Sequence, residues 1–252
     1  MIPLVAVAHG SRDPRSAATI AALLDVVRAQ RPDLDVRAAF LELSAPRLPD
    51  VLAGLAAEGH RDAVIVPLLL GAAYHARVDL PSLVAEVHAR LPRLTVTVSE
   101  VLGPDERFPS GACGANILSA VALRRLAATG VALDDPTLGV VLAGAGSSHA
   151  PANAAVAAVA ASWAHRFPTR AAFASMADPS VPEAVAALRA DGASRIAVAS
   201  WFIAPGRLPD KVAALAGPDA LVAEPLGPAP ELAALVVDRY TEAATVRSVQ
   251  YA

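Results

Sequence analysis

Three side chains in the first half of the chain are of the types that bind transition metals. His9 and His75 are imidazoles, Glu42 is a carboxylate, and each stands at or shortly after the end of a run of apolar residues. Two neutral imidazoles and one carboxylate suit a divalent transition ion, and three protein ligands leave coordination positions open for water or an incoming ligand. A closed structural site would use four protein ligands. These residues therefore predict a site that binds an ion and can release it, provided that the fold brings them together.

Short apolar runs alternate with longer helix-patterned segments in both halves of the chain, which is the pattern of βα units that build a parallel sheet. In the first half the predicted strands are 4–8, 36–42, 63–69 and 95–101, and the predicted helices are 15–28, 47–58, 77–91 and 109–128. In the second half the predicted strands are 139–143, 170–174, 195–201 and 220–224, and the predicted helices are 151–166, 181–190, 208–215 and 231–243. The strands are apolar almost throughout, as expected when helices cover both faces of a sheet.

The candidate ligands fall where a parallel sheet binds ligands, beyond the carboxyl ends of its strands. His9 directly follows the first predicted strand, Glu42 ends the second, and His75 lies in the loop after the third. We therefore expect the three side chains to meet at one edge of the first sheet. The loop at residues 10–14 opens a helix at this edge, so its N–H groups could receive an anionic group of a substrate.

The sequence is duplicated, and short motifs fix the register between the two halves. The matching motifs are Arg-Ala-Ala-Phe at 37–40 and 170–173, an acidic residue with Gly at 58–59 and 191–192, and Leu-Gly-Pro at 102–104 and 226–228. The duplication predicts two similar lobes, one at residues 1–129 with the metal site and a degenerate one at 138–252, with a linker at 129–137.

Only the first copy carries the candidate metal ligands. In the register of the repeat, the ligands and their counterparts are His9 and Ala145, Glu42 and Ser175, and His75 and Leu208. Side chains that the fold needed for packing would be expected in both halves. Their restriction to one half therefore indicates a single functional site.

Each candidate ligand also has a structural interpretation, which the sequence leaves open. His9 could cap the helix that follows it, and His75 could be a solvated loop residue. Glu42 could pair with Arg12 or Arg77 instead of a metal ion.

The other histidines and the single cysteine are weaker candidates. His60, His88 and His165 are expected at the surface, and His149 is expected to be non-catalytic at the rim of the second copy. Cys113 is expected to be a buried, inert thiol, and a single cysteine excludes an internal disulfide and any thiolate-only zinc site.

Composition and missing motifs argue against several function classes. The net charge is −3 and Lys211 is the one lysine, which disfavours nucleic acid as a partner because phosphate binding needs clustered basic residues. Charged residues interrupt every long apolar run, so no membrane partner is expected. No basic segment precedes the first strand, which disfavours a signal peptide, so a cytoplasmic protein is expected. The sequence contains no dinucleotide fingerprint and no Walker loop, so a nucleotide-binding protein has no support. Neither Ser11 nor Ser147 stands in a Gly-x-Ser-x-Gly motif, so a hydrolase has no support either.

Three longer motifs surround the candidate ligands. They are Ala-His-Gly-Ser-Arg-Asp-Pro at 8–14, Phe-Leu-Glu at 40–42 followed by Pro46, and Pro-Leu-Leu-Leu-Gly-Ala-Ala-Tyr-His at 67–75 leading to Asp-Leu-Pro at 79–81. Together they resemble the class II tetrapyrrole chelatases, and within them the sirohydrochlorin chelatase branch, which includes siroheme ferrochelatases and the early cobaltochelatases of cobalamin synthesis. The resemblance covers nearly the whole chain, including its duplication.

The resemblance implies a bilobal α/β protein of two similar chelatase-like, or flavodoxin-like, lobes. Each lobe is expected to be a parallel four-stranded sheet flanked by helices, with the active-site cleft between the lobes. The paired histidines of the family correspond to His9 and His75, and its acidic metal-site residue corresponds to Glu42. The chain has no His-rich or Cys-rich segment at its C-terminus, so no iron–sulfur cluster is expected.

The resemblance further implies insertion of Fe²⁺ or Co²⁺ into sirohydrochlorin, giving siroheme or cobalt-sirohydrochlorin. The divalent metal is a substrate in this reaction, and one histidine is expected to accept a pyrrole proton. Ser11, Arg12, Tyr74, Arg77 and Arg207 are the expected tetrapyrrole contacts, because sirohydrochlorin carries many carboxylates. The alternative is a non-catalytic metal or tetrapyrrole carrier, and in either case the fused chain is expected to be a monomer.

Overall fold

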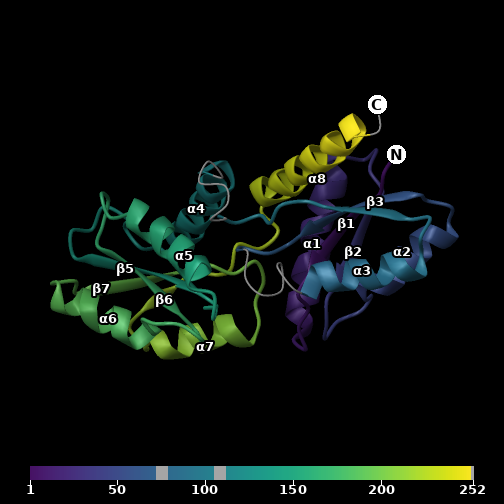
Figure 1. Cartoon of the computed structure of the whole chain (residues 1–252). Coiled ribbons are helices and arrows are strands. Elements are labelled where there is room, and N and C mark those ends of the chain that lie inside the picture. Colours follow the sequence, from purple (N-terminus) through teal and green to yellow (C-terminus); the bar gives the residue numbers. More distant parts are fainter. Residues whose placement is uncertain (72–78, 105–111, 251–252) are drawn as a thin grey trace. The chain divides into compact units, whose positions relative to one another are not determined.

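Two parallel four-stranded sheets organise the chain (Figure 1). The protein is described from a computed structural model, which covers residues 1–71, 79–104 and 112–250. The strands of the first sheet are β1 (Leu4–Ala8), β2 (Val36–Phe40), β3 (Asp62–Pro67) and β4 (Thr95–Val98), and those of the second are β5 (Leu138–Gly144), β6 (Thr169–Phe173), β7 (Arg195–Ser200) and β8 (Leu221–Val222). The order is β2-β1-β3-β4 in the first sheet and β6-β5-β7-β8 in the second, so the two halves share one topology.

Helices connect the strands, as parallel pairing requires. In chain order they are α1 (Pro14–Gln30), α2 (Leu48–Ala57), α3 (Leu80–Arg90), α4 (Ala112–Ala127), α5 (Ala150–Ser162), α6 (Val181–Ala190), α7 (Arg207–Ala216) and α8 (Pro230–Gln250). Figure 1 shows α8 on one side of the first sheet and α2 and α3 on the other. Helices therefore cover both faces of this sheet, which explains why its central strands are apolar except for Asp62 at the start of β3.

The spacing of leucines in α2 shows how a helix is fixed to its sheet. Leu48, Leu52 and Leu55 lie on one face of the helix, and each is fully buried in the core of the first sheet. Full burial of one such side chain contributes about 1.5–3 kcal/mol. Val181 and Leu188 of α6 occupy the matching positions in the second sheet and are also fully buried.

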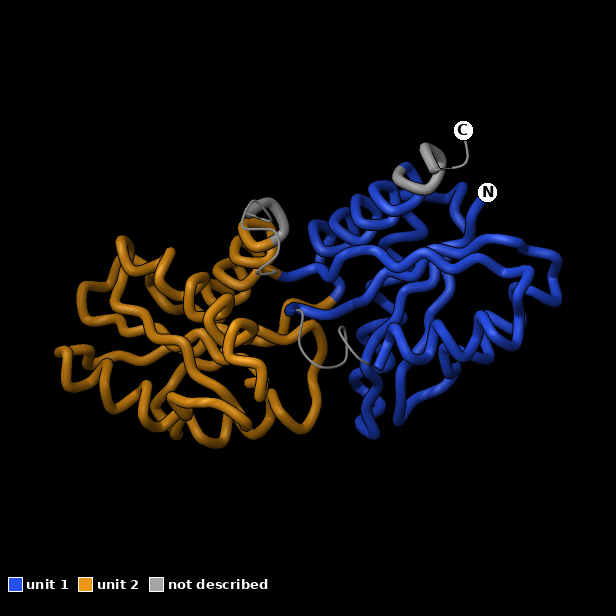
Figure 2. The backbone as a smooth tube through the Cα atoms, in the orientation of Figure 1, with its two compact units in different colours: residues 1–103, 228–252 blue, residues 104–227 orange. Residues whose placement is uncertain are grey.

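The chain forms two compact units, but their boundaries differ from the expected lobes at 1–129 and 138–252. Unit 1 comprises residues 1–103 and 228–252, and unit 2 comprises residues 104–227 (Figure 2). The helix that ends each half thus belongs to the other unit. The expected linker at 129–137 lies within unit 2, where it connects α4 to β5.

Specific contacts hold the exchanged helices in place. α8 packs against α1 and β3. The Tyr240 hydroxyl of α8 donates a hydrogen bond of 2.7 Å to the carbonyl of Ile2, and Arg239 Nε donates one of 3.0 Å to the carbonyl of Val101. In unit 2, α4 packs against β7, and Trp163 Nε1 donates a hydrogen bond of 2.6 Å to Oγ of Ser119 on α4.

Most predicted elements are present, with differences at their ends. The strand at 4–8 and the helix at 181–190 have the predicted bounds. The predicted strands at 36–42 and 63–69 end two residues early, at Phe40 and Pro67, and the last strand is only two residues long. The predicted starts of α3 at 77 and α4 at 109 lie outside the described residues. Among the helices that the structure describes, none is long and apolar enough to span a membrane.

Candidate metal centre

The fold brings His9 and Glu42 together, as the sequence predicts. Nε2 of His9 lies 3.1 Å from Oε1 of Glu42. His9 is the first residue after β1 and Glu42 the second after β2, and these strands are parallel neighbours. Both side chains remain partly open to solvent, with exposed fractions of 38% for His9 and 49% for Glu42.

Backbone hydrogen bonds fix the two side chains beside each other. The ladder between β1 and β2 continues beyond the strands, with the N–H of Leu41 donating to the carbonyl of Ala8 at 3.0 Å and the N–H of Glu42 donating to the carbonyl of His9 at 2.9 Å. His9 and Glu42 are therefore held by a direct main-chain contact as well as by their own side chains.

Ser44 ties the two loops together a second time. Its hydroxyl donates to the carbonyl of Ser11 at 2.8 Å and accepts a hydrogen bond of 3.0 Å from the N–H of Ser11. Ser44 carries little signal in the sequence beyond its counterpart in the repeat, Ala177, which lacks the hydroxyl. That mismatch, next to the mismatch of Glu42 with Ser175, is the signal that could have identified it.

Gly10 allows the close approach of these loops. Its φ is +96°, and a β-carbon added there would lie 1.7 Å from the carbonyl oxygen of Glu42. Both the backbone conformation and the lack of space therefore require glycine. Gly146 has the same role in unit 2. Its φ is +82°, and a β-carbon added there would lie 1.8 Å from the carbonyl oxygen of Ser175.

The distance between the two donor atoms fits a shared metal ion. Ligand distances of about 2.0–2.2 Å, with angles at the ion between square and tetrahedral, place two donor atoms about 2.8–3.6 Å apart. The observed 3.1 Å lies within this range. Nδ1 of His9 is buried, whereas Nε2 faces the carboxylate, so the ring presents one nitrogen toward the candidate site.

Unit 2 repeats the backbone of this site without its ligands. The N–H of Ser175 donates to the carbonyl of Ala145 at 3.0 Å, which matches the bond between Glu42 and His9. The register inferred from the sequence motifs is thereby confirmed at these positions. Since both copies fold in the same way at this edge, the fold does not require the imidazole and the carboxylate of the first copy.

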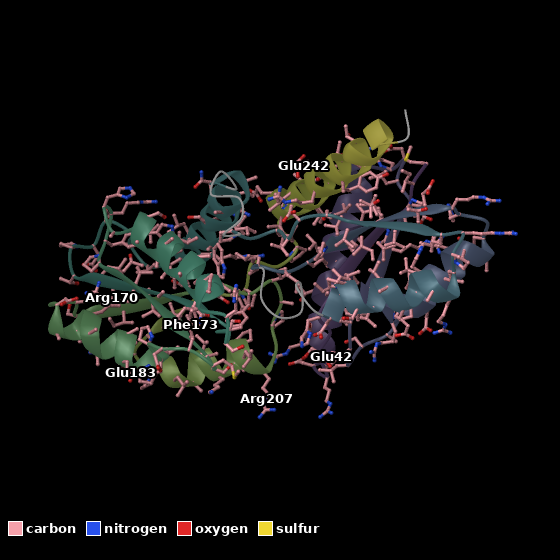
Figure 3. All side chains as sticks on the ribbon, in the orientation of Figure 1. Glu42, Arg170, Phe173, Glu183, Arg207 and Glu242 are labelled. Carbon is pink, nitrogen blue, oxygen red and sulfur yellow. The ribbon has the colours of Figure 1, made fainter. Side chains whose placement is uncertain are left out.

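One ion pair recurs at matching positions in both units, which indicates that it belongs to the fold and not to the candidate site. Arg37 bridges Glu58 at 2.6 Å and Asp35 at 2.7 Å, and Arg170 bridges Asp191 at 2.6 Å in unit 2. Arg170 stands near the start of β6 and Phe173 at its end (Figure 3), so this ion pair lies at the amino end of the strand, opposite the end that Ser175 follows. The guanidinium of Arg37 lowers the pKa of the Glu58 carboxyl.

The Asp35 and Glu58 carboxylates, with His60, form another group of potential metal ligands in the described residues. Arg37 already donates hydrogen bonds of 2.6–3.0 Å to both carboxylates. The group therefore forms an ion-pair network around a guanidinium, and the half-buried imidazole of His60, 31% exposed, lies beside it.

Asp13, and not His9, caps α1, because its carboxylate accepts a hydrogen bond of 2.9 Å from the N–H of Arg15. The guanidinium of Arg15 also lowers the pKa of Asp13. Glu42 forms no ion pair with Arg12 within the described residues; its neighbour is His9.

The remaining predicted site residues are placed only in part. Ser11 contacts Ser44 at the site, Arg12 is exposed in the same loop, and Arg207 is exposed at the start of α7 in unit 2 (Figure 3). His75, Tyr74 and Arg77 lie outside the described residues. His149 is the residue before α5, and nothing is described of the Cys113 side chain.

The chain is similar in sequence to curated tetrapyrrole chelatases. It is 30% identical over 82 residues to a protein named sirohydrochlorin cobaltochelatase from Methanosarcina acetivorans, covering 32% of this chain and 63% of that protein. It is 34% identical over 105 residues to a protein named sirohydrochlorin ferrochelatase from Priestia megaterium, covering 40% of this chain and 38% of that protein. The matches thus span less than two thirds of these relatives.

Solved structures share the fold over the whole chain. SirB from Bacillus subtilis with Fe³⁺ superposes with a TM-score of 0.78 at 22% identity and covers 98% of both chains. CbiX, described as the terminal enzyme for biosynthesis of siroheme in denitrifying bacteria, superposes with a TM-score of 0.63 at 20% identity, over 96% of this chain and 99% of that one.

The family model described as CbiX matches residues 3–110 and 139–243, which include both repeats and both described candidate ligands, His9 and Glu42. The chain therefore belongs to the CbiX family.

Proposed function

We propose that this protein inserts Fe²⁺ or Co²⁺ into sirohydrochlorin, giving siroheme or cobalt-sirohydrochlorin. The observation that carries the proposal is the His9–Glu42 pair at 3.1 Å, which stands at the carboxyl edge of one sheet and is missing from the same edge of the other. The curated relatives include proteins named for both metals, so the choice between Fe²⁺ and Co²⁺ is left to the assay.

The chemistry of insertion suits this pair. Two pyrrole N–H protons must leave the macrocycle while the ion passes from the protein to the four nitrogens. A site that holds the ion weakly and accepts protons meets both needs. In the proposed mechanism Nε2 of His9 and Oε1 of Glu42 would hold the ion together with His75. As the ion passes to the macrocycle, a histidine that it leaves accepts one of the two pyrrole protons at neutral pH, and the second proton passes to solvent water.

Tetrapyrrole binding is assigned to residues around this pair. We propose Ser11, Arg12, Tyr74, Arg77 and Arg207 as contacts for the substrate. The described arginines, Arg12 and Arg207, are exposed and take part in no ion pair within the described residues, so their guanidinium groups are available to carboxylates. The N–H groups at the start of α1 add further donors for an anionic group.

The test is an anaerobic absorbance assay of sirohydrochlorin with substoichiometric protein and either Fe²⁺ or Co²⁺. His9→Ala and Glu42→Gln should abolish multiple turnovers, because each removes one donor of the candidate site. Ser175→Ala is the matched control, since it changes the counterpart of Glu42 in unit 2 and should leave the rate unchanged. Wild-type insertion rates in folded His9→Ala protein would contradict the mechanism.

The same assay separates an enzyme from a carrier. A carrier would bind sirohydrochlorin or the ion in stoichiometric amounts and show no turnover. The exposed position of the His9–Glu42 pair favours the enzyme, because an ion held there can be approached by a second ligand.

A further inference from the structure

A pocket of about 430 Å³ opens within unit 1, at the edge of the first sheet where the strands begin. Its lining comes from the turns that lead from α2 into β3 and from α3 into β4. The candidate metal ligands His9 and Glu42 follow the opposite ends of strands of the same sheet, so the pocket is a separate feature of this unit. Pockets that bind small molecules have volumes of about 300–1,000 Å³, and this one falls in that range.

Part of the lining is apolar. Leu94 is only 1% exposed, and Leu91 and Ala56 pack against the hydrophobic core of the first sheet. Because Leu91 and Ala56 are only partly buried, an apolar group held in the pocket would remove more of their surface from water.

Four basic side chains make up most of the remaining lining, namely those of His60, Arg61, Arg90 and Arg93. Among the described residues, no aspartate or glutamate lines the pocket. In the part of the chain that the structure describes, Arg61 and Arg93 also take part in no ion pair. Each guanidinium presents N–H donors in a fixed fork that matches a carboxylate or a phosphate, so these two arginines have donors to offer an anion.

The carboxylates near the pocket are engaged elsewhere. Glu86 pairs with Arg90 at 3.6 Å, in an exposed contact that water screens. His60 lies 3.9 and 4.0 Å from two carboxylates, but Arg37 already bridges both of them. The positive charges of the two unpaired arginines are therefore not neutralised within the described structure.

A general role at helix ends does not account for these basic residues. Basic side chains often offset the negative end of a helix dipole, and Arg90 is the last residue of α3. That role would be expected in both repeats, yet α7 has no basic residue in its last turn. The segment that leads from α7 to β8, residues 213–220, contains no basic residue, whereas its counterpart in unit 1, residues 87–94, contains three.

The turn before β3 differs from its counterpart in the same way. The motif register pairs His60 with Ala193 and Arg61 with Ser194. The N–H groups of His60 and Ala193 each donate to a leucine carbonyl at 3.0 Å, so the backbone of this turn is the same in both units. The next residue of unit 2, Arg195, pairs with Asp135 at 3.3 Å. The fold therefore forms this turn without His60 and Arg61, and the basic residues of the pocket are particular to unit 1.

We propose that this pocket binds a small organic anion, that is, a carboxylate or a phosphate carried on an apolar body. Arg61 and Arg93 would hold the anionic group by charge-assisted hydrogen bonds, while Leu91 and Ala56 would contact the apolar body. The inference goes beyond the proposed function and does not depend on it, because the pocket and the candidate metal ligands lie at opposite edges of the first sheet.

The test is a titration of the whole protein followed by the NMR shifts of its backbone amides. The probes are phenyl phosphate, phenylacetate, inorganic phosphate and benzyl alcohol, which has the apolar body without the charge. We expect an organic anion to bind with a Kd of about 1 mM or tighter, inorganic phosphate to bind more weakly and benzyl alcohol not to bind measurably. The preferred organic anion identifies the anionic group. The shifts should appear at Gly59, which lines the pocket, and not at Gly192, its counterpart in unit 2.

Single substitutions then assign the binding to the arginines. We expect Arg61→Gln and Arg93→Gln each to weaken binding of the organic anion about tenfold, from the loss of one charge-assisted contact. Arg189→Gln is the matched control, because it removes an exposed arginine from the end of α6 in unit 2 and should leave the affinity unchanged. All three variants should keep their affinity for Co²⁺.

Three results would each overturn the inference. They are no binding of either organic anion up to about 10 mM, equal shifts at Gly59 and Gly192, and wild-type affinity in both pocket variants.

Discussion

Replacing Gly10 by alanine tests whether the metal site depends on the close approach of two loops. An added methyl carbon would lie 1.7 Å from the carbonyl oxygen of Glu42, whereas ordinary contact begins at 3.4 Å, so the loops must separate by about 1.7 Å. That separation would carry Glu42 away from His9, whose donor atoms now stand 3.1 Å apart. We expect Gly10→Ala to lower both stability and metal affinity.

The expected loss of stability in Gly10→Ala has two contributions, one from the backbone conformation and one from the clash. A φ of +96° is unfavourable for alanine by about 1–3 kcal/mol, and overpacking adds about 1–3 kcal/mol. A substitution at Gly59 separates the backbone contribution from the overpacking contribution, because its φ is +92° but a β-carbon there would meet nothing within 4 Å. Gly59→Ala should therefore show only the first part. The difference between the two variants corresponds to about 2–12 °C in melting temperature for a protein of this size.

Gly146→Ala is the second control, because it creates the same clash in unit 2, 1.8 Å from the carbonyl oxygen of Ser175. Thermal unfolding and Co²⁺ titration should be measured for all three variants. We expect Gly10→Ala and Gly146→Ala to be similarly destabilised, and only Gly10→Ala to lose Co²⁺ affinity, by about 10–100-fold as when a supporting partner of a metal ligand is lost. Equal destabilisation of Gly10→Ala and Gly59→Ala, with Co²⁺ binding retained, would refute the reasoning.

Three further changes probe the supports of the site and the fold. Ser44→Ala removes both hydrogen bonds to Ser11 and should destabilise the protein by about 1–2 kcal/mol while weakening Co²⁺ binding; unchanged titration would show that the bonds do not position the site. The pKa of Glu58 lies below its ordinary 4.5 because of Arg37, so the stability from this pair is present above pH 4.5 and lost as pH falls through the lowered value. Arg37→Met should therefore flatten the acid limb of the stability curve in unfolding measured below pH 5; an unchanged slope would contradict this. Tyr240→Phe removes a hydrogen bond of 2.7 Å to the first residues of the chain and should lower the melting temperature by about 2–4 °C in calorimetry, whereas no change would show that the bond is dispensable.

The elements that the sequence predicts best are those with strong local signals. The apolar run 4–8 and the helix 181–190 have their predicted bounds, and Asp13 caps the first helix as an acidic N-terminal residue can. The proximity of His9 and Glu42 follows from a general property of parallel sheets, whose carboxyl ends meet at one edge.

Other features carry no local signal. A helix with an apolar face packs equally well on either of two similar sheets, so the motif register could not reveal that α4 and α8 exchange places. Nothing about a leucine indicates a positive φ, and the conformation of Leu43 emerges only when the surrounding loop is fixed by main-chain bonds. A lone serine after a strand is common, so the sequence alone does not indicate that Ser44 joins two loops.

The exchange of helices has a consequence for how the protein is made. The segment 104–227 is synthesised between the two parts of unit 1, so the sheet of the first 103 residues must wait for α8. At about 5–20 residues per second, these 124 intervening residues take roughly 6–25 s to synthesise. During that time the surface of α1 and β3 that α8 covers is open to water or to chaperones. Unit 2, which is continuous in sequence, can close first, so the unit without the candidate metal ligands is able to finish folding before the unit that carries them.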